Sequence, residues 1–153
     1  MVAAICGYPQ DPMAMIEAET VRSLLELACP ELVAVLATGD DQYSERLLYL
    51  ELADIARWLG KAYATGATDC LPALFATVEQ CILEGTPDAI SLVVIGLLED
   101  LQNSSVTNLP EFTVLEPYLG RATHRAWEAV DRFWAGDTNA LRQWAADSGI
   151  ELT

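Results

Sequence analysis

The sequence is poor in basic residues. It has 8 Lys and Arg against 23 Asp and Glu in 153 residues, which gives a formal net charge of −15 at pH 7. A chain this negative repels phosphate groups, so nucleic acids and anionic membrane surfaces are excluded as its principal partners. A basic partner is favoured instead, because opposite charges accelerate association.

The sequence also lacks the marks of membrane and secreted proteins. Its longest apolar run, Leu92 to Leu98, is far shorter than the roughly 20 residues that span a bilayer. The first nine residues contain no basic residue and only a short apolar run, so we expect no cleaved signal peptide. The cysteines form no CxxC pair and no dense disulfide framework, which predicts a cytoplasmic protein with reduced, buried thiols at Cys6, Cys29, Cys70 and Cys81.

Patterns for catalysis, metal binding and phosphate binding are missing as well. His124 is the only histidine, and no nucleophile motif accompanies it, so we expect a structural role for it. The sequence shows no zinc-ligand spacing and no glycine-rich phosphate loop. We therefore expect no catalytic residues, no metal and no cofactor, although an enzyme that uses carboxylates alone remains a rival interpretation.

What the sequence does contain is helical periodicity. The clearest example is the segment 44–65, where Leu48, Leu52, Ile55 and Leu59 repeat at three- and four-residue steps. No segment shows sustained period-two alternation, so the predicted fold is all-α. We expect one domain over residues 1–153, a bundle of about six helices with irregular tails at 1–11 and 150–153. The predicted helices are 12–28, 44–65, 68–85, 86–101, 122–136 and 137–149, with a short helical turn at 31–38 and a turn near 112–118.

The segment 86–101 is predicted to be the central helix. Thr86 and Pro87 provide an N-cap and an N1 proline, and the residues that follow are apolar on nearly every face. The short connection after Gly85 predicts an antiparallel pair with the preceding helix. Gly96 is expected to permit close helix contact.

Charge is distributed unevenly along the chain. The 59 residues between Lys61 and Arg121 contain eight Asp and Glu but no Lys or Arg. A solvated helical face usually mixes both signs, because Glu and Lys four residues apart stabilise a helix. Solubility is one explanation for the single sign, and recognition of a basic partner is the other.

Two groups of residues are candidates for such recognition. On the 44–65 helix, Glu51, Asp54 and Trp58 share a face that is offset from the leucine stripe. A tryptophan surrounded by carboxylates is typical of an interface hot spot, although packing against a neighbouring helix would explain it too. At the C-terminal end of the central helix, where the helix dipole disfavours negative charge, the sequence places Glu99, Asp100 and Asn103.

Part of the sequence resembles a known class of proteins. Residues 75–103, FATVEQCILEGTPDAISLVVIGLLEDLQN, resemble a HEAT-type helix pair. The later motifs PYLG at 117–120 and FWAG at 133–136, together with Trp127, resemble small bacterial helical proteins associated with polymorphic toxins and presumed to be immunity proteins. The resemblance covers residues 45–136 and leaves 1–44 unmatched. It implies a cytoplasmic protein without catalytic residues that binds and blocks a toxin.

These observations together favour an immunity-type protein that neutralises a cognate, basic protein toxin through an acidic helical surface. The partner-binding residues would be Glu51, Asp54, Trp58, Glu99, Asp100 and Asn103. The main rival is a general helical-repeat adaptor for protein–protein interactions without a link to a toxin.

Overall fold

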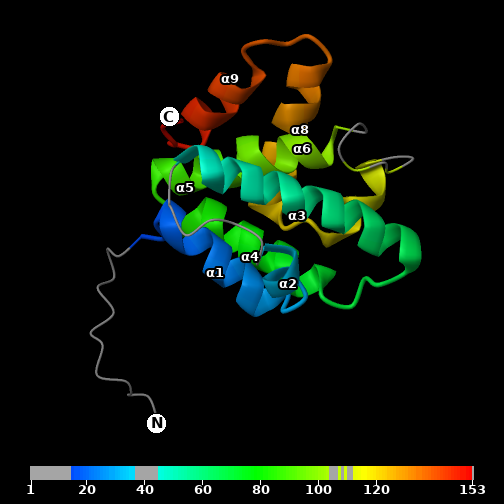
Figure 1. The fold of residues 1–153 in the computed structure, drawn as a ribbon. Coiled ribbons are helices and arrows are strands. Elements are labelled where there is room, and N and C mark those ends of the chain that lie inside the picture. The colour runs from blue at the N-terminus through cyan, green and yellow to red at the C-terminus, as the bar shows by residue number, and fades with distance from the viewer. Residues whose placement is uncertain (1–14, 37–44, 104–106, 108, 110–111, 153) are drawn as a thin grey trace.

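The computed structural model describes residues 15–36, 45–103, 107, 109 and 112–152 (Figure 1). These residues contain no β-strand, which confirms the all-α prediction. Their helical elements are α1 (Ala18–Ala28), α2 (Leu32–Leu36), α3 (Glu45–Thr65), α4 (Leu71–Glu84), α5 (Pro87–Ser91), η1 (Leu92–Leu98), α6 (Glu99–Leu101), η2 (Phe112–Tyr118), α8 (Arg121–Trp134) and α9 (Ala140–Asp147).

Most predicted helices are found close to their expected positions. Helix α3 covers nearly the whole predicted segment 44–65, and α4 ends at Gly85 as expected. The predicted cap of α5 is also present, because the side-chain oxygen of Thr86 accepts a hydrogen bond of 3.3 Å from the backbone N–H of Ala89. The expected total of about six helices is not confirmed, since the 86–101 segment is divided and residues 112–118 form a 3₁₀ helix.

The first helix starts later than predicted. The expected cap at Asp11 and Pro12 lies outside the described residues, and α1 begins only at Ala18. Just before it, the N–H of Ile16 donates to the carbonyl of Glu84, and the N–H of Thr86 donates to the carbonyl of Ile16, each at 2.8 Å. This extended contact holds the chain against the turn between α4 and α5, so residues 15–17 are not helical.

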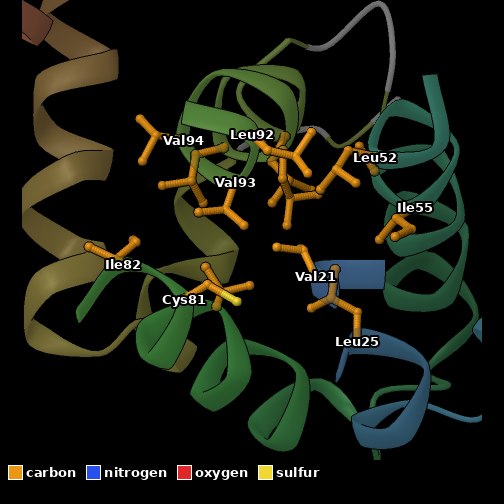
Figure 2. Packing of buried hydrophobic residues seen from close by; sticks show 14 of the residues in the cluster. Val21, Leu25, Leu52, Ile55, Cys81, Ile82, Leu92, Val93 and Val94 are labelled. Carbon is orange, nitrogen blue, oxygen red and sulfur yellow. The ribbon is translucent and has the colours of Figure 1, made fainter. Parts of the chain in front are cut away.

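The segment Pro87–Leu101 is the central element of the fold, as its apolar composition predicted. It contacts α1, α3, α4 and α8, and Leu92, Val93 and Val94 point into a core shared with α1, α3 and α4 (Figure 2). A Cβ atom at Gly96 would lie 3.0 Å from a ring carbon of Tyr49, so this glycine does permit a close approach to α3.

The central element is not a continuous α-helix, however. Residues Leu92–Leu98 form a π-helix, and the N–H of Glu99 bonds to the carbonyl of Val94, five residues earlier. The β-branched run Val93 to Ile95 and the following Gly96 have low intrinsic α-helix propensity, which lowers the cost of this wider winding. The prediction of an unbroken α-helix was therefore wrong over these residues.

The cysteine prediction was wrong for two of the four residues. Cys29 and Cys70 form a disulfide, with their Cα atoms 5.3 Å apart and a sequence separation of 41. The pair forms because α1 ends and α4 begins where these two helices pack together. Cys81 is buried and free, as predicted, and Cys6 lies outside the described residues. The cysteines therefore no longer argue for a reducing compartment.

Among the described residues, no helix combines the length and the apolar character that crossing a bilayer requires.

Candidate partner-binding surface

The structure brings the two predicted groups of acidic residues onto adjoining elements. Asp54 lies on α3, Glu99 and Asp100 lie on α6, and α3 contacts α6 (Figure 1). Between them lies Arg57, which forms an exposed 2.8 Å ion pair with Asp54 and acts electrostatically on Asp100. We call Asp54, Arg57, Trp58, Glu99 and Asp100 the α3–α6 surface.

Glu99 and Asp100 are electrostatically unusual within this surface. Both are half-buried, and this burial raises the pKa of each carboxyl group above its ordinary value. The charge of Asp100 raises the pKa of Glu99 further, while Arg57 partly offsets the effect of burial on Asp100. Within the described part of the chain, neither carboxylate forms an ion pair. The fold thus partly buries two adjacent acids and gives neither of them an ion pair among these residues, although Arg57 acts on Asp100 at longer range.

The π-helix leads directly into this acidic pair. Its last residue, Leu98, is followed by Glu99, the residue whose N–H makes the π-type hydrogen bond. The backbone at the start of α6 is therefore offset from the position that a regular α-helix would give it. Such π-helical segments are often found at functional sites.

Trp58 and Asn103 are both partly exposed. Trp58 packs on one side against the hydrophobic core. The alternative expectation, that this tryptophan packs within the fold, is therefore met for its buried side. Asn103 donates its backbone N–H to the carbonyl of Asp100 at 3.1 Å, which places it at the end of α6. Both lie close in sequence to the acids of the α3–α6 surface, and Trp58 keeps a partly exposed edge that a partner can contact.

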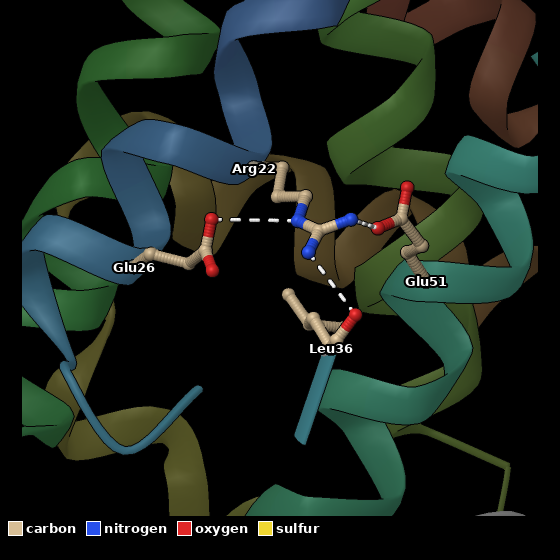
Figure 3. Close-up of polar contacts among 4 residues, drawn as sticks. All are labelled: Arg22, Glu26, Leu36 and Glu51. Carbon is tan, nitrogen blue, oxygen red and sulfur yellow. Dashed lines mark hydrogen bonds and ion pairs between the residues drawn. The ribbon is translucent and has the colours of Figure 1, made fainter. Parts of the chain in front are cut away.

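Glu51 does not belong to the α3–α6 surface. It is only 4% exposed, and its carboxylate pairs with the guanidinium of Arg22, which also bonds to Glu26 at 3.3 Å and to the carbonyl of Leu36 at 3.0 Å (Figure 3). Burial raises the pKa of Glu51, and Arg22 opposes this shift. The prediction that Glu51 contacts a partner is therefore corrected, because this residue joins α3 to α1 inside the fold.

A second internal carboxylate, Glu79, was not singled out from the sequence. Its oxygens accept hydrogen bonds from the N–H of Ala122 at 3.0 Å and from the N–H and hydroxyl of Thr123, each at 2.7 Å. Burial alone would raise the pKa of Glu79, but these three bonds outweigh it and hold the pKa below its ordinary value. Glu79 therefore caps the N-terminus of α8 from α4, a role that only the tertiary fold reveals.

A groove of about 1030 Å³ lies near this junction, between α4, α5, α8 and α9. Its walls include the apolar side chains of Ile82, Ile90 and Trp144 together with two arginines, Arg121 and Arg125. Sequence analysis could not identify this groove because its walls come from four separate segments.

Among the comparisons with known proteins, one finds a similarity that covers most of the chain. No curated protein and no solved structure matches it. A model of one protein family, described as a domain of unknown function (DUF7674), matches residues 22–135. This match includes the α3–α6 surface, Arg22 and Glu79, but ends before α9. Since the match extends over most of the sequence, the chain belongs to the DUF7674 family.

Proposed function

We propose that this protein is an immunity-type inhibitor, which binds a cognate toxin through the α3–α6 surface and blocks it by occlusion in the cytoplasm. The observation that carries the proposal is the pair Glu99 and Asp100, half-buried and without an ion-pair partner among the described residues. An Arg or Lys from a partner would relieve the unfavourable burial of these charges, so association would be stabilised at this point.

Two further features support a protein partner over a small substrate. The net charge of −15 favours a basic partner at long range. The partly exposed Trp58 provides an apolar anchor beside the carboxylates, which is typical of interface hot spots. On this proposal, the helix pair formed by α4 and the Pro87–Leu101 segment corresponds to the HEAT-type hairpin that the sequence resembles.

The experiment begins with co-expression of the protein and the protein encoded by the neighbouring gene, followed by purification of any complex. The variant Glu99→Gln/Asp100→Asn should weaken the complex by at least about tenfold, since a few central residues dominate interface affinity. The variant Glu128→Gln/Asp131→Asn, which makes the same charge change at exposed positions on α8, should leave affinity within about twofold.

Each possible outcome distinguishes this proposal from one alternative explanation. Equal loss in both variants would indicate that only net charge matters, and unchanged binding in the α3–α6 variant would reject this surface. Stable binding to a protein that is not toxic when expressed alone would favour the general helical adaptor. Saturable turnover of a small substrate by the purified chain would reject both interpretations.

A further inference from the structure

The disulfide lies beside a third group that is able to bind a metal. Cys29 caps the C-terminus of α1, and Cys70 caps the N-terminus of α4. Glu31 follows Cys29 by two residues, and its Oε2 lies 3.3 Å from the Cys29 Sγ. The two sulfur atoms and one carboxylate oxygen of Glu31 all lie within 4.8 Å of one another.

These three groups are a suitable donor set for zinc. Zn²⁺ binds thiolates at about 2.3 Å and carboxylates at about 2.0–2.2 Å, in tetrahedral geometry. Two sulfurs on one tetrahedral zinc ion lie roughly 3.8 Å apart. Rotation of the two side chains can supply that separation, because the Cα atoms are already 5.3 Å apart.

We propose that the dithiol form of this protein binds one Zn²⁺ through the Sγ atoms of Cys29 and Cys70 and the carboxylate of Glu31, with water as the fourth ligand. Cys29 is buried and Glu31 is exposed, so the ion would lie at the edge of the fold with an open path from solvent. The N-terminus of α4 stabilises a thiolate at Cys70, since negative charge is favoured there.

Metal binding and the disulfide exclude each other, because both use the same sulfur atoms. Reduction of the disulfide adds two electrons and two protons and yields two thiols. Zinc binding then releases those protons as the thiolates coordinate. The oxidised protein therefore serves as an internal control that differs from the metal-binding form at one covalent bond.

The test uses the full chain, reduced with a phosphine that is oxidised to its phosphine oxide as the disulfide becomes two thiols. After anaerobic removal of the phosphine, Zn²⁺ is titrated in competition with a chromophoric chelator. We expect one equivalent to bind the reduced protein and none to bind the oxidised protein. Cys29→Ser or Cys70→Ser should weaken binding by at least about 100-fold and Glu31→Gln by at least about tenfold, because losing a direct ligand should cost no less than losing an outer-shell partner, about 10–100-fold.

Cys81 provides the matched control. It is buried, and burial together with the nearby Glu84 raises the pKa of its thiol to about 11, so it does not form a thiolate at neutral pH. Cys81→Ser and Cys6→Ser should therefore leave zinc affinity unchanged. Circular dichroism of each metal-free variant establishes that it is folded.

A second measurement does not depend on variants. Bound zinc should slow alkylation of Cys29 and Cys70 in the reduced wild-type protein by at least about tenfold, as mass spectrometry of peptides would show, and should not protect Cys6. Zinc binding that survives loss of either Cys29 or Cys70 would overturn the proposal. So would the absence of a saturable one-equivalent site, or equal alkylation rates with and without zinc.

Discussion

Two partly buried glutamates, Glu79 and Glu99, have pKa values that are shifted in opposite directions. Glu79, between α4 and α8, accepts three hydrogen bonds, and its pKa is lowered. For Glu99, at the start of α6, burial and the charge of the adjacent Asp100 both raise the pKa. The comparison shows that burial alone does not determine what a carboxylate does. The donors around it decide whether its charge stabilises the fold or requires a partner.

Arg22 and Glu51 extend this comparison to the interior. There the carboxylate is more deeply buried than either Glu79 or Glu99, yet a cation is supplied within the fold. The molecule thus holds an ion-paired acid, a hydrogen-bonded acid and an unpaired acid in one small bundle. Variants at each of these three acids or their partners should differ in the size and sign of their effect on the free energy of unfolding.

The largest effect should follow from Arg22→Met. This change leaves Glu51 buried without a cation, and we expect the free energy of unfolding to fall by about 2–3 kcal/mol at neutral pH. Urea denaturation measures the change. The double variant Arg22→Met/Glu51→Leu should recover most of the loss, and Arg57→Met, which breaks an exposed pair, should cost less than about 0.5 kcal/mol. A double variant as unstable as the single one would show that Arg22 acts through packing instead.

Glu79→Gln should have the next largest effect, a loss of about 1–2 kcal/mol, because an amide supplies only one of the two acceptor oxygens and no charge. A lowered folded-state pKa means that Glu79 contributes stability above its unfolded pKa and loses it as the pH falls through the folded-state pKa. The difference between the variant and wild type should therefore shrink on acidification below pH 4.5, the ordinary value for Glu. A difference that stays constant with pH would assign the loss to geometry alone.

Glu99→Gln/Asp100→Asn should have the smallest effect on the free energy of unfolding. Its sign should be opposite to that of the two preceding changes, because this variant should be more stable than wild type at neutral pH. Their raised pKa values mean that these groups favour the folded state most below their unfolded pKa values, and that this contribution is lost as pH rises through the folded-state pKa values. The double variant should thus match wild type in acid and exceed it by up to about 1 kcal/mol at neutral pH, after allowance for solvent screening. Thermal melts between pH 3.5 and 7.5, in steps of about half a unit, measure the difference. A variant that is less stable at neutral pH would contradict the assignment.

Much of this fold could be predicted from the sequence, because it follows from local periodicity. The leucine spacing of α3, the Thr86 cap and the apolar composition of the central segment each depend on residues close together in the chain. The helical periodicity did not reveal the π-helix, since a run of apolar residues fits either winding. The irregular conformation of residues 15–17 depends on the contacts of Ile16 with Glu84 and Thr86, far along the chain.

The candidate site could be predicted only in part, for a related reason. Spacing placed Asp54 and the Glu99–Asp100 pair on helices, but it could show neither that these elements meet nor that Glu51 faces Arg22, 29 residues away. It also missed Arg57, although its position three residues after Asp54 was available as a signal. Contacts between distant segments, including the Cys29–Cys70 disulfide and the Glu79 cap, have no local pattern from which to predict them.

The Arg22–Glu51 pair also determines where the charge of the molecule lies. Glu51 is the one buried acid among the described residues, and its charge is balanced by Arg22. Nearly all of the excess negative charge of the described chain is therefore carried at or near the surface. At physiological ionic strength its field extends about 8 Å into solvent. An approaching basic protein would thus be attracted before any side chains touch, and short-range contacts would then decide whether it stays.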